Sequence, residues 1–299
     1  MTANFDPVAI SLGSLEIRWY GLMYVIGFLL GWYFGRKRAP RYGWAGRDVD
    51  DLVTICMLGC ILGGRLGYII FYDLPVYLND PMEMLRFWDG GMSFHGAAIG
   101  LALAFCYFAK TRKCHFIDIA DFITPLVPQG LLFGRIGNFI NGELWGKTTD
   151  LPWGVIFPDA GPLPRHPSQL YESFLEGLVL WIVMWIFTRK ERPRGQAAGL
   201  FAMGYAVFRF LVEFVRLPDP QLGYLAFGWV TMGQILCLPL FAFGVWLFSR
   251  ITRSRLQSPA HPRLPEPEKK TKPGRLHRRL FSCRAFSAHV FLDITGISC

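Results

Sequence analysis

The chain has 299 residues, of which 52% are hydrophobic and 18% are charged, and its mean hydropathy is +0.30. An average soluble domain carries about 25% charged residues, so the composition favours an integral membrane protein over a soluble one. The net charge of +9 suggests nucleic acid or anionic lipid as a partner, and the positions of the basic residues decide between these two.

Long apolar stretches follow one another along the chain, each sufficient to cross about 30 Å of hydrocarbon as a helix. They cover residues 19–35, 52–72, 93–109, 117–140, 170–187, 198–217 and 229–249. The fourth contains Pro125 and Pro128, which a transmembrane helix tolerates as a kink. This pattern predicts an all-α integral membrane protein of about seven transmembrane helices with a small periplasmic loop region.

Basic residues predict the orientation, because cytoplasmic loops are enriched in lysine and arginine. Fifteen lie in loops 36–51, 110–116, 188–197 and 250–257, and five lie in the other set of loops. Those five are Arg18, Arg86, Lys147, Arg165 and Arg216. The N-terminus is therefore expected in the periplasm and the C-terminus in the cytoplasm. Topology accounts for the positive charge, so membrane lipids are predicted as partners and nucleic acid is not.

The composition divides the chain at residue 257. Residues 1–257 are predicted to form one membrane domain. Residues 258–299 begin with a proline-rich and charged run that is typical of disorder, and no function is assigned to this tail.

Three basic residues, Arg65, Arg135 and Arg209, fall inside the predicted spans, each nearer the outer end. Charge is costly in hydrocarbon, so such residues usually pair internally or contact a polar substrate. Other polar side chains gather at the same depth, namely Tyr20, His95, Asn138, Asn141, Glu143, Arg165, His166, Ser168, Gln169, Tyr171, Glu213 and Arg216. The common depth predicts one site that opens toward the outer leaflet.

Spacing adds detail to this site. Tyr205, Arg209, Glu213 and Arg216 are four, four and three residues apart, which places them on one helix face. The competing interpretation is a buried Arg–Glu pair that only fixes helix packing.

Glycines flank two of the arginines, in GGRLGY (63–68) and GRIGNF (134–139). Glycine permits close helix approach and also leaves room beside a guanidinium group. Gly134 and Gly137 are expected to provide that room for an anionic headgroup at Arg135.

Several common catalytic motifs are missing from the sequence. It contains no HExxH, no GxSxG, no CxxC pair and no His–carboxylate cluster with metal spacing, so no metal site and no cofactor are predicted. His95, at the start of the third span, is either an interfacial anchor or a catalytic base. With these motifs absent, the sequence favours a pocket in which guanidinium groups bind an anion.

Seven motifs occur in order, and together they resemble the prolipoprotein diacylglyceryl transferase family of the bacterial inner membrane over about residues 5–250. The motifs are RWYGLMYVIGF (18–28), GGRLGYIIFY (63–72), WDGGMSFHGAAIG (88–100), GRIGNFINGELWG (134–146), RHPSQLYESFLEG (165–177), YAVFRFLVEFVRLPD (205–219) and TMGQIL (231–236). The resemblance implies transfer of a diacylglyceryl group from phosphatidylglycerol to the lipobox cysteine of a prolipoprotein signal peptide. It also implies an inner-membrane enzyme with a periplasmic active site.

The resemblance implies roles for individual residues. Arg135 corresponds to the arginine of the family's signature motif, associated with phosphatidylglycerol, and Arg209 with Glu213 matches its other functional charged pair. The expected catalytic set is Tyr20, His95, Arg135, Asn138, Arg209 and Glu213, and the expected phosphatidylglycerol-binding set is Arg65, Arg135, Glu143, Gly146, Tyr205 and Arg209. In this hypothesis Arg135 and Arg209 bind the phosphate, and His95 is the candidate base.

Two other functions compete with the transferase. A transporter for an anionic solute would need polar groups in the cytoplasmic half of the spans, where Asp118 and Asp121 are the main candidates. A non-catalytic lipid-binding or assembly protein would use the arginines only as structural ion pairs.

Overall fold

The computed structural model describes residues 2–12, 15–71, 93–218 and 223–254, and five isolated positions between residues 71 and 93. Those five are Leu74, Tyr77, Asp80, Met82 and Met84. The chain divides into a first unit, Met1–Arg38 with His115–Ala260, and a second unit, Ala39–Cys114 with His261–Cys299. The predicted disordered tail, 258–299, lies outside the described residues.

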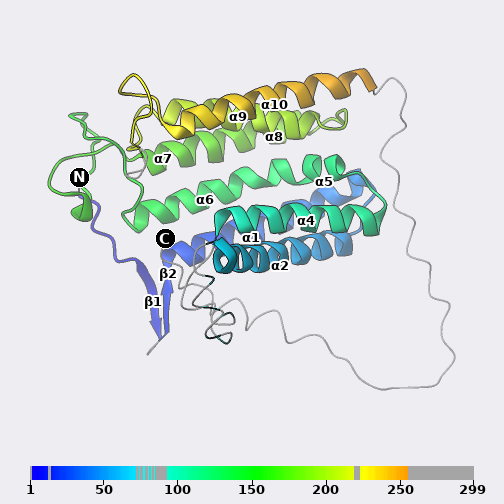
Figure 1. Ribbon diagram of the computed structural model, residues 1–299, viewed down its shortest axis with the longest axis horizontal. Coiled ribbons are helices and arrows are strands. Elements are labelled where there is room, and N and C mark those ends of the chain that lie inside the picture. Colours follow the sequence, from blue (N-terminus) through cyan, green and yellow to red (C-terminus); the bar gives the residue numbers. More distant parts are fainter. Residues whose placement is uncertain are drawn as a thin grey trace. The chain divides into compact units, whose positions relative to one another are not determined.

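The first unit is a bundle of helices, which Figure 1 shows as neighbouring rods. Its helices are α1 (Trp19–Arg38), α5 (Phe116–Ile123), α6 (Val127–Ile140), α7 (Ser168–Glu172), α8 (Leu180–Phe187), α9 (Gln196–Val212) and α10 (Met232–Ser254). Helix α6 packs against α1, and α9 packs against α10 and α8. Leu180, Met184 and Ala197 form a buried apolar cluster at the α8–α9 contact.

Two of the predicted spans are built from helical segments of different type. The 3-10 turn η4 (Thr124–Leu126) joins α5 to α6 at Pro125 and Pro128, because proline lacks the N–H that a continuous helix needs. The predicted interruption of the fourth span is therefore confirmed. In the fifth span, the π-helix η6 (Ser173–Val179) lies between α7 and α8.

Among the described residues, four helical segments are long and apolar enough to cross a membrane. They are Gly46–Phe71, Phe116–Ile140, Ser168–Phe187 and Met232–Ser249. Helix α9 is apolar but has only 17 residues, and α1 ends in Arg36, Lys37 and Arg38. The prediction of a mostly helical, multi-pass membrane protein is confirmed, whereas seven separate spans are not established by length and composition.

A small β-hairpin precedes the first helix, in addition to the predicted helical membrane fold. Strand β1 (Val8–Leu12) pairs antiparallel with β2 (Leu15–Arg18), with Ile10 opposite Ile17. The sequence LEIR alternates apolar and charged residues, which is the pattern of a half-buried strand. This signal is only four residues long and is easily overlooked beside the apolar spans.

Two helix boundaries also differ from the prediction. Helix α2 (Gly46–Phe71) begins in the basic loop before residue 52, because Asp48 accepts a hydrogen bond from Ala45 N at 2.7 Å. Helix α9 ends at Val212, before residue 217, and the chain then turns at Phe214–Arg216 with backbone bonds back to Leu211 and Val212.

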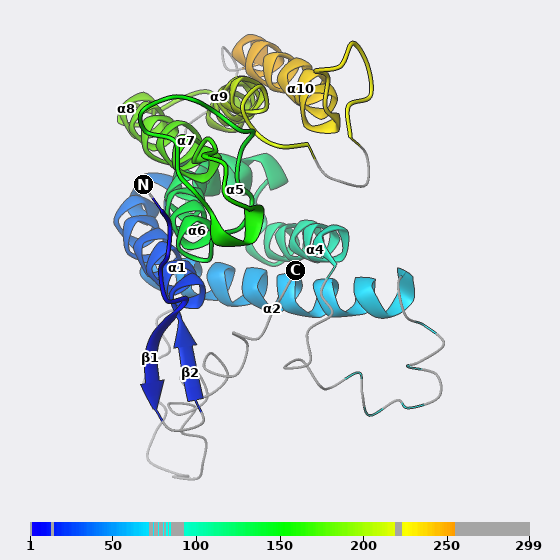
Figure 2. The same ribbon diagram turned by 90° about the vertical axis from the view of Figure 1, so that its left-hand side faces the viewer.

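The second unit contains the 3-10 turn η1 (Ala39–Tyr42), α2 and α4 (Phe94–Arg112). Figure 2 shows α2 and α4 side by side, and glycines line their contact. A Cβ atom added to Gly59 would lie 2.6 Å from Gly100 O, and one added to Gly67 would lie 2.7 Å from Gly96 Cα. The predicted close helix approach at GGRLGY is therefore confirmed.

A compact loop region, residues 141–167, follows α6 in the first unit. Its core consists of Ala3, Val155 and Phe157, with Phe139 and Trp145 packed against it. Ala3 N donates to Ile156 O at 2.9 Å, which ties the start of the chain to the loop. The small loop region that the sequence predicts is present, and it begins where α6 delivers Arg135 and Asn138.

Candidate functional site

Six charged side chains meet in the first unit, and we call them the Arg–Glu cluster. They are Arg135 on α6, Glu172 on α7, Glu176 on η6, Arg209 on α9, and Glu213 with Arg216 directly after α9. The carboxylate side chains of Glu172, Glu176 and Glu213 are 1%, 0% and 4% exposed. Three guanidinium groups thus face three buried carboxylates.

Glu172 lies at the centre of the cluster. Its Oε2 atom is 2.5 Å from Arg135 Nε, and its Oε1 atom is 2.9 Å from Arg216 Nη1 and 3.2 Å from Arg209 Nη1. These arginines come from different segments of the chain. One carboxylate therefore brings three guanidinium groups to a single point, where a compact anion has several donors available.

Glu213 holds Arg209 from the other side. Arg209 Nη2 is 2.5 Å from Glu213 Oε1, so the pairing predicted from their four-residue spacing is confirmed. The second Glu213 oxygen accepts a hydrogen bond from Thr231 Oγ1 at 2.7 Å. This fixes the carboxylate and, through it, one edge of the Arg209 guanidinium group.

Glu176 is the least satisfied member of the cluster. Neither of its carboxyl oxygens has a hydrogen-bond partner among the described residues, and its Oε1 atom is 4.0 Å from Arg209 Nη1. It lies in the π-helix η6, and such segments occur frequently at functional sites. A buried carboxyl group without hydrogen bonds is costly for folding, so its retention needs a reason beyond packing.

A chain of polar side chains leads from Arg135 into the loop region. Arg135 Nη1 donates to Asn138 Oδ1 at 3.3 Å, and Asn138 Nδ2 donates to Glu143 Oε1 at 2.9 Å. Asn141 Nδ2 also donates to Glu143 Oε1, at 3.4 Å. The structure thus places the predicted residues Asn138 and Glu143 next to Arg135, and Glu143 orients the amide that touches the guanidinium group.

A small cavity of about 40 Å³ reaches the cluster beside α9 and α10. Arg209, Glu213, Leu217, Gly223, Arg216, Thr231, Met232 and Gly233 line it. A Cβ atom on Gly233 would lie 2.7 Å from the Glu213 carboxyl carbon, so glycine is needed there to admit the carboxylate. The cavity gives access to two of the three arginines.

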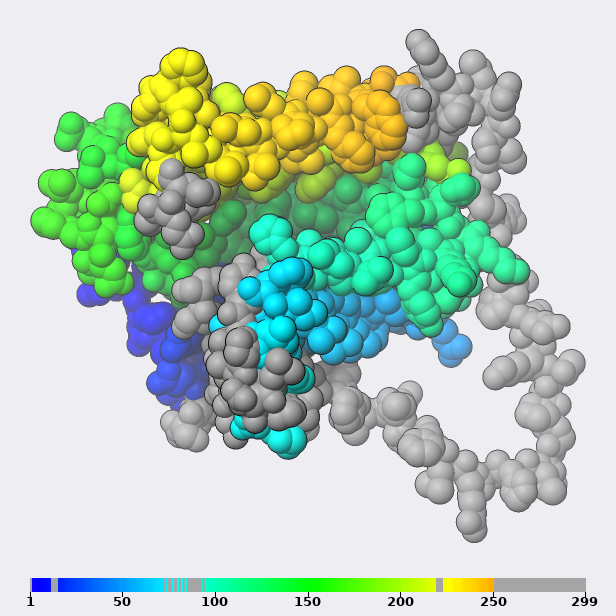
Figure 3. Space-filling model, in the orientation of Figure 1, coloured from blue at the N-terminus to red at the C-terminus, as the bar shows by residue number. Residues whose placement is uncertain are grey.

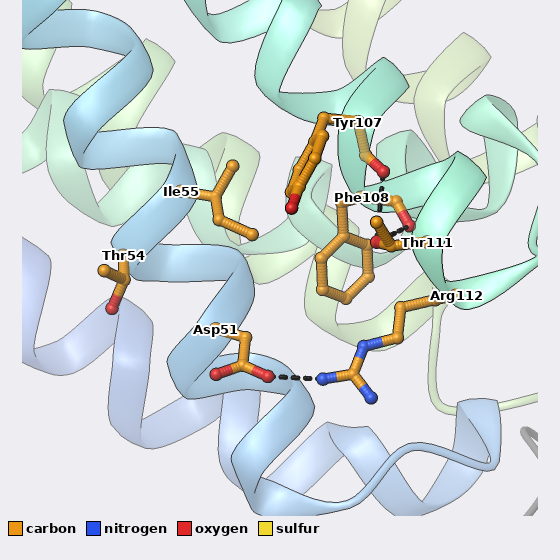
Figure 4. A pocket seen from close by; sticks show the side chains of 7 residues that line it. All are labelled: Asp51, Thr54, Ile55, Tyr107, Phe108, Thr111 and Arg112. Atoms are coloured by element: carbon orange, nitrogen blue, oxygen red, sulfur yellow. Dashed lines mark hydrogen bonds and ion pairs between the residues drawn. The ribbon is translucent and has the colours of Figure 1, made fainter.

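A larger cavity, about 430 Å³, lies in the second unit between α2 and α4 (Figure 4). Its charged residue Arg112 pairs with Asp48 at 2.7 Å and with Asp51. Thr54 and Thr111 donate their hydroxyl protons to carbonyl oxygens of their own helices. Because its arginine and threonine side chains already have partners, this cavity is a weaker candidate for a site than the cluster.

The glycines around Arg135 have a different role from the predicted one. A Cβ atom on Gly137 would lie 3.0 Å from the ring of Tyr20, and one on Gly134 would lie 3.8 Å from the ring of Tyr24. At Gly137 the room is therefore taken by the Tyr20 ring of α1, whereas the Tyr24 ring lies at an ordinary contact distance from Gly134. Tyr20 is consequently held against α6, with its hydroxyl 3.0 Å from that of Tyr24.

Two further predicted residues have clear packing roles. Tyr205 packs on the α8–α9 apolar cluster, with its ring 6.0 Å from that of Phe201. Gly146 N donates to His166 O at 2.9 Å, and a Cβ atom on Gly146 would lie 2.6 Å from Val215 O. Gly146 also forms a β-bridge with Arg216, so it joins the loop region to the cluster by its backbone.

Arg65 and His95 belong to the second unit. Arg65 is 4% exposed, its Nε atom donates to Met84 O at 3.2 Å, and its guanidinium carbon is 5.2 Å from the centre of the Tyr77 ring. His95 is exposed in the first turn of α4. Their participation in the same site as Arg135 stays a prediction.

Comparison with known proteins shows to which family the chain is related. The sequence model of the family described as prolipoprotein diacylglyceryl transferase matches residues 7–250. A protein of Nitratidesulfovibrio vulgaris (strain DP4) is 60% identical over 82% of this chain and 94% of its own length. Proteins of Methylococcus capsulatus and Pseudomonas aeruginosa (strain LESB58) are 57% and 53% identical over 82% and 83% of this chain, and over 94% and 95% of theirs. All three are named phosphatidylglycerol–prolipoprotein diacylglyceryl transferase.

The chain belongs to the prolipoprotein diacylglyceryl transferase family. The family recognised from seven sequence motifs is thereby confirmed, as is the assignment of the chain as a transferase. The matched region includes the whole Arg–Glu cluster and ends before the tail.

Two members of the cluster were missed by the sequence analysis of this transferase-family chain. Glu172 and Glu176 appear in YESFLEG, four residues apart inside an apolar run. Ionisable residues in such a run are functional candidates by default, and this spacing puts both on one helix face. Both carboxylates lie within RHPSQLYESFLEG (165–177), so this signal is present in the sequence.

The aspartates that favoured a transporter have structural partners. Asp118 pairs with Arg194 at 2.6 Å and 3.1 Å. Asp121 accepts from Gly195 N and, at 2.8 Å, from Ala198 N, at the start of α9. These contacts explain both residues without a transported solute. Among the described residues, no group of three or more His, Cys, Asp or Glu side chains is arranged to hold a metal ion.

Proposed function

We propose that the chain transfers the diacylglyceryl group of phosphatidylglycerol to the thiol of the lipobox cysteine of a prolipoprotein. The products are a thioether-linked lipid and glycerol phosphate. Family membership supports this reaction. The structural observation that carries it is the convergence of Arg135, Arg209 and Arg216 on the single buried carboxylate of Glu172, because this arrangement suits one compact anion such as a lipid phosphate.

The proposal includes the membrane topology. Helices α1, α4 and α9 have 20, 19 and 17 residues and, at about 1.5 Å per residue, are near the length that hydrocarbon requires. With the four candidate spans they give seven. The distribution of basic residues supports a periplasmic N-terminus, a cytoplasmic C-terminus and a location in the bacterial inner membrane. The ends of α6 and α9, with the cluster, then face the periplasm.

In this proposal Arg135 and Arg209 bind the phosphate of phosphatidylglycerol. Glu213 orients Arg209, as their 2.5 Å contact supports. Glu172 holds the arginines together before the lipid arrives and gives up part of its contacts to the phosphate. Asn138 and Glu143 align Arg135, whereas Gly146 and Tyr205 act through the packing of the surrounding backbone and helices.

The reaction is a substitution at the glycerol carbon that carries the phosphate ester. The sulfur of the substrate cysteine forms a bond to this carbon, and the carbon–oxygen bond to phosphate breaks with its electron pair on oxygen. Negative charge grows on the phosphate as the bond breaks, so the arginines bind it more strongly in the transition state than in the ground state. The thiol proton leaves through a base and is balanced by protonation of the glycerol phosphate.

The base must act on a thiol whose ordinary pKa is about 8.5 and which is mostly protonated at neutral pH. We propose His95 for this step, with Tyr20 contacting the headgroup or holding the arginines. Arg65 serves lipid binding or packing of the second unit. A pH–rate profile that is unchanged in His95→Gln would remove His95 from the mechanism.

The first test uses purified protein in vesicles containing phosphatidylglycerol and a synthetic lipobox peptide with one cysteine. Mass spectrometry is expected to show a gain of one diacylglyceryl group, and no gain when that cysteine is serine. Arg112→Gln is the matched control for Arg135→Gln, since Arg112 is also an ion-paired arginine but lies outside the cluster. A missing mass gain in the unmodified protein, with lipid still bound, would contradict the proposed reaction.

A further inference from the structure

An apolar turn lies between α9 and α10, and it has no part in the transfer reaction proposed above. We call residues 224–229, YLAFGW, the aromatic turn. Leu225 N donates to Val230 O at 2.8 Å, and Trp229 N donates to Ala226 O at 3.3 Å. The segment is yellow in Figure 3 and lies at the surface of the first unit.

Phe227, at the tip of the aromatic turn, is in an unfavourable position for a residue of its type. It is 88% exposed and has a φ of 51°, in the left-handed region that side chains with a Cβ rarely adopt. Glycine or asparagine would fit this backbone with less strain. Neither burial nor backbone preference within the described residues accounts for phenylalanine here.

Exposed apolar side chains also lie on both sides of the aromatic turn along the chain. Trp229 stacks on Phe214 with ring centres 5.5 Å apart, and both are about half exposed. On the other side α10 exposes Ile235, Leu236 and Leu238. These three lie in a candidate membrane span that begins at Met232. Exposed apolar side chains are therefore present both on the aromatic turn and at the start of this candidate span.

A basic side chain accompanies the aromatic rings. Lys147 Nζ is 5.0 Å from the centre of the Tyr224 ring and donates to Phe214 O at 2.8 Å. Tyrosine and tryptophan are enriched where a protein crosses the boundary between hydrocarbon and water. A nearby cation adds attraction for anionic lipid headgroups. Composition, charge and position next to a span all fit a lipid surface.

We infer that the aromatic turn is an anchor in the interfacial layer of the bilayer, with Phe227 inserted among the lipids. The turn is flanked by Gly223 and Thr231, which line the cavity at Arg209 and Glu213. Anchoring the turn therefore holds one wall of that cavity at the level of the lipid headgroups. This inference does not depend on the proposed reaction.

The test replaces Phe227 with the photoreactive residue p-benzoylphenylalanine in the full-length protein. The protein is placed in vesicles of phosphatidylglycerol and phosphatidylethanolamine together with a synthetic lipobox peptide. The matched control carries the same residue in place of Trp153, an exposed aromatic side chain of the loop region. After irradiation, mass spectrometry is expected to find mainly phospholipid adducts at position 227, several-fold more than at position 153.

Two results would overturn the anchor. Adducts formed mainly with the peptide would make the turn a peptide-docking element, and phospholipid adducts no more frequent than at position 153 would exclude insertion. Crosslinking needs no turnover, so its result can be interpreted even if the protein does not lipidate the peptide. A missing lipidation would count only against the proposed function.

A second variant checks the inference without a bulky probe. In Phe227→Asn the new side chain tolerates the positive φ, so the melting temperature in detergent is expected to stay equal or rise. In vesicles, proteinase K, which does not require an aromatic residue at the cleaved bond, should then cleave the turn several-fold faster than in the unmodified protein, whereas Phe227→Trp should keep the protection. Equal cleavage of Phe227→Asn and the unmodified protein would contradict the anchor.

Discussion

Two buried ionic networks in the first unit lie at opposite ends of α9. At its start, Asp118 and Asp121 each face donors in fixed positions, Arg194 for the first and the backbone of Gly195 and Ala198 for the second. At its end, one carboxylate in the Arg–Glu cluster is shared by three arginines, and another, Glu176, has no hydrogen bond among the described residues. A cavity lined by Arg209, Glu213 and Arg216 reaches the second network.

The difference separates a structural network from a binding one. Carboxylates whose two oxygens are both occupied by donors within the fold stabilise the segments that they hold together, here the start of α9. In the cluster three guanidinium groups share the Glu172 carboxylate, so their other N–H donors can bind an additional anion. The following predictions test whether substitutions at the two ends of α9 affect stability and activity differently.

The largest effect is expected for Glu172→Gln. Removing one partner from a buried ion pair costs about 3–5 kcal/mol, and here three arginines lose their common partner. Both the melting temperature in detergent and the transfer rate should fall strongly. The matched variant is Glu176→Gln, whose carboxyl makes only a 4.0 Å contact, and it should retain most of the stability. Equal destabilisation by the two variants would contradict the central place of Glu172.

Arg135→Gln should lower the rate of transfer more than it lowers stability. Losing one group that stabilises developing charge typically reduces kcat about 10²–10³-fold. Arg135→Lys should recover only part of the activity, since lysine cannot form the bidentate contact. Initial rates per folded molecule provide the measurement, with Arg112→Gln as the control. A normal rate in Arg135→Gln would remove Arg135 from the phosphate site.

Some contacts of this site could be predicted from the sequence and others could not. The pairing of Arg209 with Glu213 follows from a four-residue spacing, and the break between α5 and α6 follows from Pro125 and Pro128, because both are local properties of a helix. The contact of Glu172 with Arg216 joins residues 44 positions apart. Such contacts depend on how helices pack, which no local pattern specifies.

The glycines illustrate the same limit. The sequence around Arg135 predicts open space at Gly134 and Gly137. It does not specify whether a lipid headgroup or a tyrosine ring of α1 fills the space. The distinction requires knowing which helix lies opposite.

Asp121→Ala is expected to act in the opposite way to Arg135→Gln. It removes the acceptor for two backbone N–H groups at the start of α9, and loss of such a cap costs about 0.5–2 kcal/mol. The melting temperature should therefore fall while the rate per folded molecule stays close to that of the unmodified protein. If the rate fell as strongly as in Arg135→Gln, the start of α9 would belong to the functional site and the contrast between the two networks would fail.

The smallest effect is expected at His166, whose backbone bonds to Gly146 next to Arg216. Burial, and then the positive charge of Lys147, lower the pKa of His166 below its usual value of about 6.5. The unfolded chain therefore binds this proton more readily than the folded one, so stability falls as pH drops from about 6.5 toward the lowered pKa. The effect should stay below about 1 kcal/mol, because water screens a partly exposed ring.

Melting temperatures of His166→Gln and the unmodified protein between pH 7 and pH 5 measure this contribution. The variant should lose less stability on acidification than the unmodified protein. Asp121→Ala should show the same acid-dependent loss as the unmodified protein, because His166 belongs to the end of α9 that carries the cluster. If His166→Gln left the pH dependence unchanged, the acid sensitivity would have to come from other titratable groups, and the burial of His166 would not contribute to it.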